Sequence, residues 1–575
     1  MSGSSSSNNM PLRSLGWFRG REYYNFSRRA NLRSEGFLFD KFEGKPVIGI
    51  CNSWSELNNC NAHLRQVAEA VRRGVLAAGG FPLEFPTISL GEQYMKPTTM
   101  LFRNLMAMDV EESIRANPLD GVVLLCGCDK TTPAQLMGAA SADIPAIVVT
   151  GGPTLSGNYK NTPFATGTDG RKIFDLYRTG SVSEEELQEI EGCMVRSAGH
   201  CTVMGTASTM ASIAEALGMT LPGGAAIPAP DSRRLQLAEA SGRRMVEMLL
   251  EGNALRPTQI MTREAIENAI TVNMAIGGST NAVIHLLAIA GRLGHNITLD
   301  DFDRISRITP YLANIRPSGE FLMEDFFFAG GIPAVMRELL SERLHGNCIT
   351  INGKTIAENV AQAPCHNRAV VREYANPIHP EGGTVVLYGN LAPNGAVLKQ
   401  TAASPHLLQH KGKAYVFNGH DEMITGVDRL DLPIDKDTVL VMKNAGPKGA
   451  PGMPEWGHIP MPKVLLNQGI KDMVRISDAR MSGTSFGTVV LHIAPESAIG
   501  GPLALVETGD EIELDVAGRK INLNISQEEW DRRVKAFQPA KPHYTRGYGK
   551  LFLDHVTQAN QGCDFDFLMA EVPSK

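Results

Sequence analysis

The strongest constraint on the fold is an unbroken apolar run that ends in a group of potential metal ligands. Residues 121–126 read Gly-Val-Val-Leu-Leu-Cys, and Gly-Cys-Asp-Lys follows directly. An apolar run without polar alternation is typical of a strand buried on both faces, as in a parallel sheet covered by helices. Ligands of such sheets gather at the carboxyl ends of the strands. The run therefore predicts a site at Cys128, Asp129 and Lys130, where a soft metal ligand, a hard metal ligand and a titratable amine meet.

Strand-like and helix-like patterns alternate through the first part of the chain. We expect strands or extended segments at 46–51, 81–90, 121–127 and 146–150, and helices at 64–78, 101–116 and 133–142. This alternation is typical of a doubly wound α/β domain with a parallel sheet. Three further helices are expected near 202–218, 232–251 and 263–293.

The pattern changes after about residue 345, where short β-rich runs alternate with glycine and proline turns. These runs lie at 383–388, 414–417, 438–442, 489–492 and 510–516. They predict a β-barrel or a β-sandwich. We therefore expect a partly disordered N-terminal extension at 1–34, an α/β domain at 35–380 and a β-barrel-like domain at 381–575.

Composition limits the classes of function. A length of 575 residues implies roughly three or four compact units. A net charge of −6 argues against a nucleic-acid binder, which would carry a basic field. The start at 1–9 is low in complexity and lacks the apolar core of a secretory signal, and no apolar stretch reaches the length of a membrane span. Nine cysteines over this length indicate reduced thiols, so we expect a cytoplasmic protein.

Three cysteines share a sequence context. Cys60, Cys128 and Cys201 each come shortly before, or at the start of, a helix-like segment, and a helix N-terminus favours a thiolate. Three converging thiolates would suit an iron–sulfur cluster with one incomplete iron, which could act as a Lewis acid. The competing interpretation is three buried, inert cysteines, and spacing alone favours it because no CxxC pair is present. The inert interpretation is kept for Cys51, Cys126, Cys193, Cys348, Cys365 and Cys563.

Three acidic residues are candidate oxygen ligands for Mg²⁺. They are Glu92, Asp129 and Glu455, and the first and last lie in Gly/Pro-rich segments rather than on charged helix faces. Mg²⁺ prefers carboxylates and keeps open positions for substrate oxygens. The competing interpretation for each is a solvated surface carboxylate. Lys130 is either the ion-pair partner of Asp129 or an amine modified into a metal ligand.

The segment 478–487 contains two serines of interest, Ser482 and Ser485. Residues 483–487 match Gly-x-Ser-x-Gly, so a serine-hydrolase elbow with His543 or His555 is a formal alternative. An elbow requires a helix after the serine, whereas the residues from 488 onward read as a strand. The hydrolase interpretation is therefore disfavoured.

Five long motifs carry a resemblance to a known family, and they lie at 127–133, 277–282, 380–384, 446–455 and 478–487. From about residue 35 to the C-terminus the chain resembles the dihydroxy-acid and sugar-acid dehydratases. The resemblance implies an iron–sulfur cluster held by Cys60, Cys128 and Cys201. It also implies Mg²⁺ held by Glu92, Asp129, Glu455 and a carbamylated Lys130, with Ser482 as the catalytic base.

The implied reaction removes water from a 2,3-dihydroxy acid. The substrate carboxylate and C2 oxygen bind Mg²⁺, which acidifies the C2 proton, and Ser482 removes that proton as an alkoxide. The C3 hydroxyl leaves on the cluster iron, and the enol tautomerises to a 2-keto-3-deoxy acid.

The branch of the family is read from the segments 131–138 and 546–568, which resemble the sugar-acid enzymes that act on L-arabinonate or D-xylonate. That branch implies a [2Fe-2S] cluster, although three cysteines equally fit [4Fe-4S] with one open iron. The close alternative is the branched-chain amino-acid enzyme, which converts 2,3-dihydroxyisovalerate to 2-ketoisovalerate. A phosphorylated sugar acid is less favoured, because no added basic cluster is evident.

Two other classes remain open alternatives. A non-catalytic iron–sulfur sensor would need only the cysteines, and a serine hydrolase would need Ser485 and no metal. For the dehydratase, the resemblance implies a homodimer or a homotetramer built as a dimer of dimers. Its partner is a small-molecule sugar acid, with no nucleic acid and no membrane.

Overall fold

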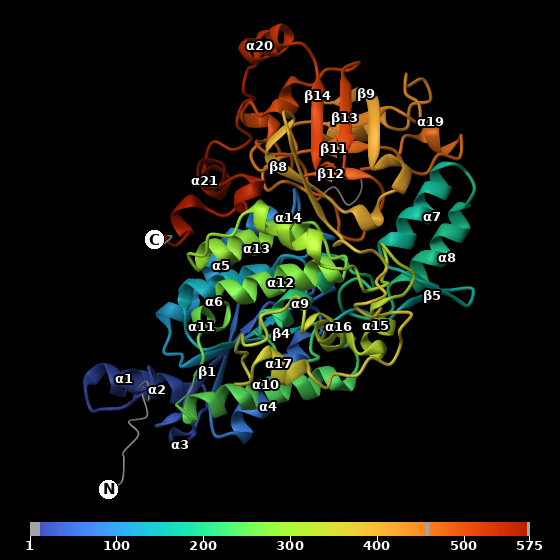
Figure 1. The fold of residues 1–575 in the computed structure, drawn as a ribbon. Coiled ribbons are helices and arrows are strands. Elements are labelled where there is room, and N and C mark those ends of the chain that lie inside the picture. The colour runs from blue at the N-terminus through green and yellow to red at the C-terminus, as the bar shows by residue number, and fades with distance from the viewer. Residues whose placement is uncertain (1–11, 253, 456–458, 572–575) are drawn as a thin grey trace.

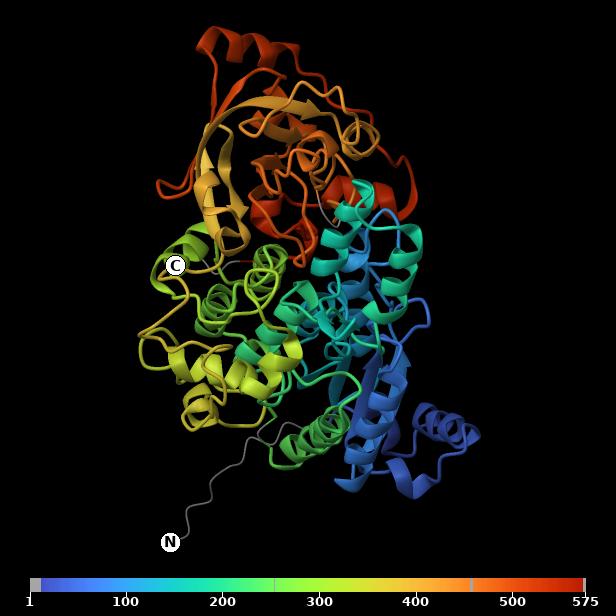
Figure 2. The same cartoon turned by 90° about the vertical axis from the view of Figure 1, so that its right-hand side faces the viewer.

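Two bodies of different architecture make up the structure, a computed structural model that describes residues 12–252, 254–455 and 459–571. An α/β body contains a four-stranded sheet, and a closed eight-stranded barrel follows it in the chain. In Figure 1 the barrel, drawn from yellow-orange to red, lies above the α/β body. Figure 2 shows the same two bodies from the side. The predicted α/β fold with a C-terminal barrel is confirmed.

The sheet of the α/β body is entirely parallel. Its strands are β1 (Val47–Asn52), β2 (Phe81–Pro86), β3 (Gly121–Cys126) and β4 (Ala146–Thr150). They lie in the order β2-β1-β3-β4. Every residue of β1, β3 and β4 is buried, as unbroken apolar runs predict. The chain first moves from β1 to β2 and then crosses to β3 on the other side of β1, so the topological switch point lies between β1 and β3.

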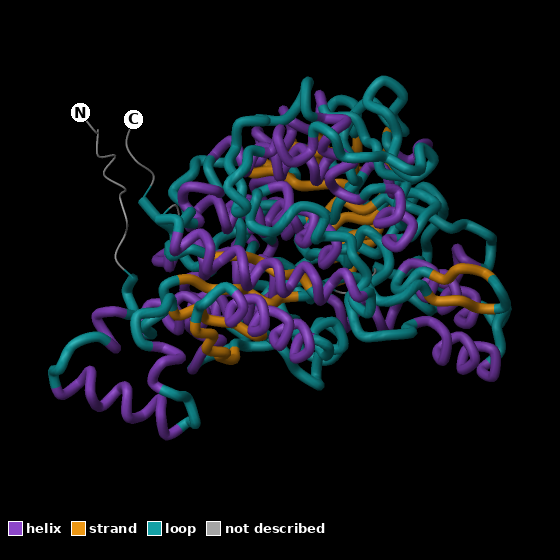
Figure 3. Tube along the Cα trace, turned by 90° about the horizontal axis from the view of Figure 1, so that it is seen from below, coloured by secondary structure: helices purple, strands orange, loops and turns teal. Residues whose placement is uncertain are grey.

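Helices cover both faces of this sheet. The covering helices are α4 (Leu64–Ala77), α5 (Met100–Ala116), α6 (Thr131–Ala142) and α10 (Ser232–Leu250). Because parallel crossovers are right-handed, the reversal at β1 and β3 places α4 on one face and α5 and α6 on the other. Helix α4 packs on α10, and α5 packs on α6. Figure 3 shows helices on both sides of the strands. The doubly wound prediction therefore holds.

Further helices extend the α/β body beyond the sheet. They are α7 (Thr168–Arg178), α8 (Glu184–Met194), α9 (Thr206–Ala216), α11 (Pro257–Ile260), α12 (Arg263–Ala275), α13 (Asn281–Arg292), α14 (Leu299–Ile308), α15 (Met323–Ala329), α16 (Gly331–Leu339) and α17 (Ile356–Val360). A short antiparallel pair, β5 (Gly157–Tyr159) and β6 (Thr162–Phe164), precedes α7.

The prediction of one helix over 263–293 is wrong, because residues 276–280 separate α12 from α13. Gly277 has a φ of +57°, which a continuing right-handed helix does not allow. A Cβ on the next residue, Gly278, would lie 2.0 Å from the Asn273 Oδ1 atom. The two glycines therefore end α12 and turn the chain tightly into α13.

The barrel mixes parallel and antiparallel pairs. Its strands are β7 (Val385–Gly389), β8 (Ala392–Leu398), β9 (Gln409–Phe417), β10 (Val439–Met442), β11 (Arg475–Ser477), β12 (Val489–Leu491), β13 (Glu511–Asp515) and β14 (Lys520–Asn524). They close in the order β10-β11-β12-β8-β7-β14-β13-β9. Valine, leucine and isoleucine side chains from these strands fill a core of their own. The helices of this half are α18 (His420–Gly426), α19 (Lys463–Leu466), α20 (Gln527–Ala536) and α21 (Gly547–His555).

Part of the predicted N-terminal extension is helical. Helices α1 (Leu15–Phe18) and α2 (Tyr23–Ser34) lie within it, and α3 (Phe39–Phe42) follows it. Together they form an arm at the edge of the α/β body, away from the barrel (Figures 1 and 2). Phe18 and Phe42 pack with Phe81 of β2 and anchor the arm. The low-complexity start expected to be disordered lies outside the described residues. None of the described helices is long and apolar enough to cross a membrane.

The C-terminal segment returns from the barrel and is fixed to the α/β body by buried charges. Asp564 is fully buried and accepts two hydrogen bonds from Arg292 on α13, at 2.5 and 3.1 Å. Arg103 on α5, also buried, donates to the carbonyl oxygens of Gly562 and Cys563 at 2.9 Å each. These bonds hold the end of the chain against α5 and α13.

We expect Asp564→Ala to lower the free energy of unfolding by about 3 kcal/mol, the low end for a broken buried pair, because the buried Arg292 guanidinium loses its bidentate partner and keeps only Glu111, at 3.3 Å, as a carboxylate partner. Urea unfolding followed by circular dichroism measures the change. The matched control is Asp554→Ala, which breaks the half-exposed Lys550–Asp554 pair of 2.7 Å and should lower the free energy of unfolding much less, because exposed ion pairs contribute little. Equal losses in the two variants would contradict the role given to Asp564.

Candidate active site

Three cysteines lie together at the edge of the sheet, two of them in loops that follow sheet strands. Cys60 lies in the loop after β1, and Cys128 follows β3, so the switch point places them side by side. Cys201 lies on a later segment, which is hydrogen-bonded to the loop after β1 and to the loop after β4. The Gly199 amide donates to the Asn59 carbonyl at 3.1 Å, and the His200 amide donates to Gly152, just after β4, at 3.0 Å.

The three thiols interact, and those of Cys60 and Cys201 are poor acids in the protein alone. The hydrogen bond to Cys128, followed by burial and by the proximity of Cys201, raises the pKa of Cys60 well above its usual value. Burial, with a smaller contribution from Asp129, raises the pKa of Cys201 to about 12. All three are free cysteines. Three adjacent soft ligands, whose ionised forms need a compensating cation, are a donor set that fits an iron–sulfur cluster.

Gly127 permits the close approach of the loops after β1 and β3. A Cβ at this position would lie 2.8 Å from the Cys60 carbonyl oxygen and 2.7 Å from the Asn61 Oδ1 atom. Both distances are shorter than real Cβ contacts allow. Asn61 is itself buried and fixed, because its Nδ2 donates to the Ser53 carbonyl at 2.9 Å. A side chain at Gly127 would therefore push Cys60 away from Cys128.

Beside the thiols, Lys130 lies among three carboxylates. Its Nζ atom is 2.6 Å from Glu455, 3.1 Å from Glu92 and 3.5 Å from Asp129, and its side chain has no exposed surface. Burial alone would lower the pKa of Lys130, but the carboxylates of Glu455 and Glu92 outweigh it and raise the pKa above its usual range. Glu92 follows β2, and Glu455 comes from the barrel half of the chain. The four predicted Mg²⁺ ligands are thus close together.

The four predicted ligands differ in charge state. Although burial would raise it, the pKa of Glu455 is lowered to about 2 by Lys130 and Arg480. Burial, together with Glu455 and Glu92, raises the pKa of Asp129 to about 7. Among the described residues, no three His, Cys, Asp or Glu side chains are arranged so that they could hold a metal ion. The three carboxylates are instead gathered around the Lys130 ammonium.

The donor set nevertheless fits Mg²⁺. The carboxylates supply hard oxygen ligands, and a cation is already required at their centre to offset their charge. Lys130 supplies that charge here. A carbamate on its amine would reverse the sign and add oxygen ligands, so a divalent cation would then take the place of the ammonium.

Ser482 lies on a loop of the barrel half that packs against the α/β body. Its Oγ is 2.9 Å from the Thr484 Oγ1, which also accepts a hydrogen bond from Arg171 on α7. Asn281, the first residue of α13, donates to Glu455 at 3.1 Å and to the Met481 carbonyl at 3.3 Å. One amide therefore joins the serine loop to the carboxylate group.

The geometry disfavours a serine-hydrolase triad. The chain after Ser485 forms strand β12, as predicted, and not the helix of a nucleophile elbow. His543 is bonded to the Gly449 carbonyl at 2.7 Å, and His555 is bonded to Asp566 at 2.9 Å. Both candidate histidines are thus engaged outside the serine loop.

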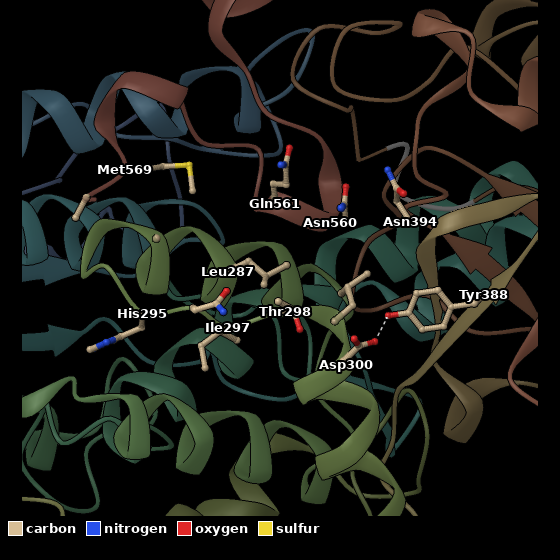
Figure 4. A pocket seen from close by; sticks show the side chains of 14 residues that line it. Leu287, His295, Ile297, Thr298, Asp300, Tyr388, Asn394, Asn560, Gln561 and Met569 are labelled. Carbon is tan, nitrogen blue, oxygen red and sulfur yellow. Dashed lines mark hydrogen bonds between the residues drawn. The ribbon is translucent and has the colours of Figure 1, made fainter. Parts of the chain in front are cut away.

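A separate cavity of about 370 Å³ lies between α13, α14, β7 and the C-terminal segment. Figure 4 shows its lining, including His295, Asn560 and Gln561. The carboxylate of Asp300 in this cavity already has a hydrogen-bond partner, because the Tyr388 hydroxyl donates to it at 2.7 Å. None of the predicted site residues lines it. The candidate chemistry therefore lies at the sheet edge and not in this cavity.

Sequence reasoning gave no role to several side chains that organise the site. Arg480 donates to Glu455 at 3.0 Å and to the Met453 carbonyl at 2.9 Å. Thr98 and Thr99 donate to Glu92. Asn281 and Arg480 stand within motifs that carried the resemblance, so a signal existed for them. For the two threonines the sequence offers no comparable signal.

Comparison with known proteins identifies relatives over nearly the whole chain. The model for the dihydroxy-acid/6-phosphogluconate dehydratase N-terminal domain matches residues 45–359, and the model for the C-terminal domain matches residues 369–563. An L-arabonate dehydratase of Azospirillum brasilense is 52% identical, with 98% of each chain covered. An L-arabinonate dehydratase of Rhizobium leguminosarum is 52% identical over 97% of this chain and 96% of its own. A dihydroxy-acid dehydratase of Saccharolobus islandicus is 40% identical over 94% and 96%.

We expect Gly127→Ala to weaken cluster binding on the order of 10-fold, because the added methyl group separates the Cys60 and Cys128 loops. Iron and sulfide content of anaerobically purified protein measures the loss. The control is Gly192→Ala in helix α8, where a Cβ meets nothing within 4 Å. Full iron content in Gly127→Ala would show that the close approach is not needed.

Proposed function

We propose that this chain, which belongs to the dihydroxy-acid/6-phosphogluconate dehydratase family, removes water from a 2,3-dihydroxy sugar acid to give a 2-keto-3-deoxy acid. The observation that carries the proposal is the convergence of three thiols, three carboxylates and Lys130 at one sheet edge. The loop of Ser482 is bonded to the same group through Asn281. A purely cluster-binding sensor would need the cysteines but neither the carboxylates nor the serine.

We assign the substrate to the pentonates, with L-arabinonate and D-xylonate as the leading candidates. The support is that relatives named for L-arabonate and L-arabinonate are 52% identical, whereas a relative named dihydroxy-acid dehydratase is 40% identical. The second candidate is 2,3-dihydroxyisovalerate, because the same site chemistry serves both acids.

We assign an iron–sulfur cluster to Cys60, Cys128 and Cys201, with [2Fe-2S] favoured over [4Fe-4S]. We assign Mg²⁺ to Glu92, Asp129, Glu455 and a carbamylated Lys130. When bound, these groups would supply Lewis-acid polarisation of the substrate oxygens.

Ser482 is the proposed base that takes the C2 proton. Thr484 bonds to its Oγ and in turn accepts from the half-buried Arg171 guanidinium, whose positive charge would favour the ionised hydroxyl. Arg480 and Asn281 orient Glu455. The serine loop also packs tightly against the start of α9, since a Cβ on Gly483 would lie 2.8 Å from the Thr206 amide nitrogen. These contacts fix the base relative to the ligand groups.

We further propose a cytoplasmic homodimer or homotetramer. All nine cysteines are free thiols, which agrees with a reducing compartment. Size-exclusion chromatography with light scattering measures the oligomeric state.

We expect Ser482→Ala to lower kcat on the order of 10²- to 10⁴-fold, because the C2 proton loses its acceptor. Keto-acid formation with Mg²⁺ under anaerobic conditions measures turnover, and iron, sulfide and magnesium contents should stay unchanged. The control is Ser181→Ala on the exposed turn after α7. Turnover retained by Ser482→Ala with full metal content would remove this serine from the mechanism.

Within a panel of pentonates, hexonates and 2,3-dihydroxyisovalerate, we expect the highest kcat/KM for a pentonate. A site that hydrogen-bonds the distal hydroxyls should disfavour the branched acid by about 100-fold or more. The same keto-acid assay compares all substrates. A preference for dihydroxyisovalerate would select the second candidate, and an active protein without iron would exclude the proposed chemistry.

A further inference from the structure

Lys399 is a buried amine to which neither the sequence nor the comparisons assign a role. It follows strand β8 directly. Its side chain keeps some exposed surface, but the Nζ atom is buried and has no hydrogen-bond partner among the described residues. A buried ammonium without a partner is unfavourable, so the neutral amine is preferred. Burial accordingly lowers the pKa of Lys399 to about 7.

The Lys399 side chain lines a small cavity together with the serine loop. The cavity has a volume of about 20 Å³, and Ser482 and Ser485 form part of its wall with Thr280, Ala402, Met481, Gly483, Gly487, Val489 and Leu491. About 10–15 Å³ is enough for one water molecule with polar neighbours. Hydroxyl groups and the amine supply such neighbours. Among the residues that line this cavity, Lys399 is the one with a basic side chain.

The charged groups around the cavity already have partners. Asp472 and Arg475, the first residue of β11, form an ion pair of 2.9 Å. Arg171 reaches Ser482 only through Thr484, and as a guanidinium it donates protons and does not accept them. Burial is the one cause that lowers the pKa of Lys399. The amine therefore offers a lone pair near a serine that must lose its proton.

We propose that Lys399 accepts the hydroxyl proton of Ser482 through one water molecule in this cavity. The inference rests on the proposed function, which makes Ser482 the base. The arrangement matches the general requirement that a hydroxyl be activated by an adjacent base, for which serine–lysine pairs are a known solution.

The proton balance closes over one turnover. The Oγ–H bond of Ser482 breaks, and an N–H bond forms on Lys399, which gives an alkoxide and an ammonium. The alkoxide takes the C2 proton, and the C3–O bond breaks with its electron pair on the departing hydroxide. The ammonium then yields its proton to that hydroxide. Water and the enol are released, and Ser482 and Lys399 return to their starting forms.

The first test is the pH dependence of Lys399→Met. In the unaltered enzyme kcat should rise with pH through about 7, because the neutral amine is the active form. The variant should lose this rise and show a kcat lower by about 100-fold or more, with KM and metal content nearly unchanged. The matched control is Lys443→Met, which removes a barrel lysine already bonded to the Ala504 carbonyl at 2.8 Å. A variant that keeps both kcat and the rise overturns the proposal.

The second test does not depend on activity. Ser482→Cys places an ionisable thiol at the same position, and its alkylation by iodoacetamide is followed by peptide mass spectrometry across pH. With Lys399 present, half-reaction should occur about one pH unit or more lower than with Lys399→Met, because an ammonium stabilises the thiolate. Identical profiles overturn the proposal. If Lys399→Met does not fold, Lys399→Gln replaces it in both tests.

The two tests separate this inference from the proposed function. If no sugar acid or dihydroxy acid is turned over but the alkylation profiles differ, the dehydratase function fails and the proton acceptor stands. If turnover is normal and neither the pH profile nor the alkylation responds to Lys399, the function stands and the proton acceptor fails.

Discussion

The buried Lys130 ammonium and its three carboxylates are the interaction on which the site depends. Glu92 and Asp129 come from loops after β2 and β3, whereas Glu455 comes from the barrel half of the chain. Removing Lys130 would leave three carboxylates without the cation at their centre, which costs more than the interaction contributes when intact. The cluster therefore requires the loops of both bodies to be placed correctly at once. The ammonium occupies the centre of the carboxylates, where the proposed Mg²⁺ would otherwise balance their charge.

Strand β3 explains why two ligand sets lie so close together. The strand ends at Cys126, so the next residues emerge at the edge of the sheet in sequence. Cys128 lies beside the other thiols, whereas Lys130 lies among the carboxylates, of which Asp129 is one. A small acid bound there would lie beside both sets of side chains. This arrangement agrees with the proposed dehydration of a 2,3-dihydroxy acid.

The α/β fold could be predicted from the sequence, because the strands of the parallel sheet are buried on both faces and therefore appear as unbroken apolar runs. The barrel was predicted, but β8, β11 and β14 were not, since β8 contains Pro393 and Gly395 and β11 has only three residues. Cys126 was correctly placed in the core. The site residues were named through family motifs, because spacing alone favoured inert cysteines. The environment of Lys399 could not be predicted from the sequence, because its amine becomes buried without a partner only when β8 packs beside the serine loop.

The two bodies contribute different residues to the proposed site, and the C-terminal segment helps to hold the bodies together. The sheet edge supplies the thiols and most of the carboxylates, while the barrel half supplies Ser482, Lys399 and Glu455. No covalent link fixes the distance between these sets except the chain itself. The Arg292–Asp564 pair and the bonds from Arg103 hold the barrel's return segment on α5 and α13. Since α13 begins at Asn281, which bonds both Glu455 and the serine loop, a shift of this helix would move the proposed base and Glu455 together.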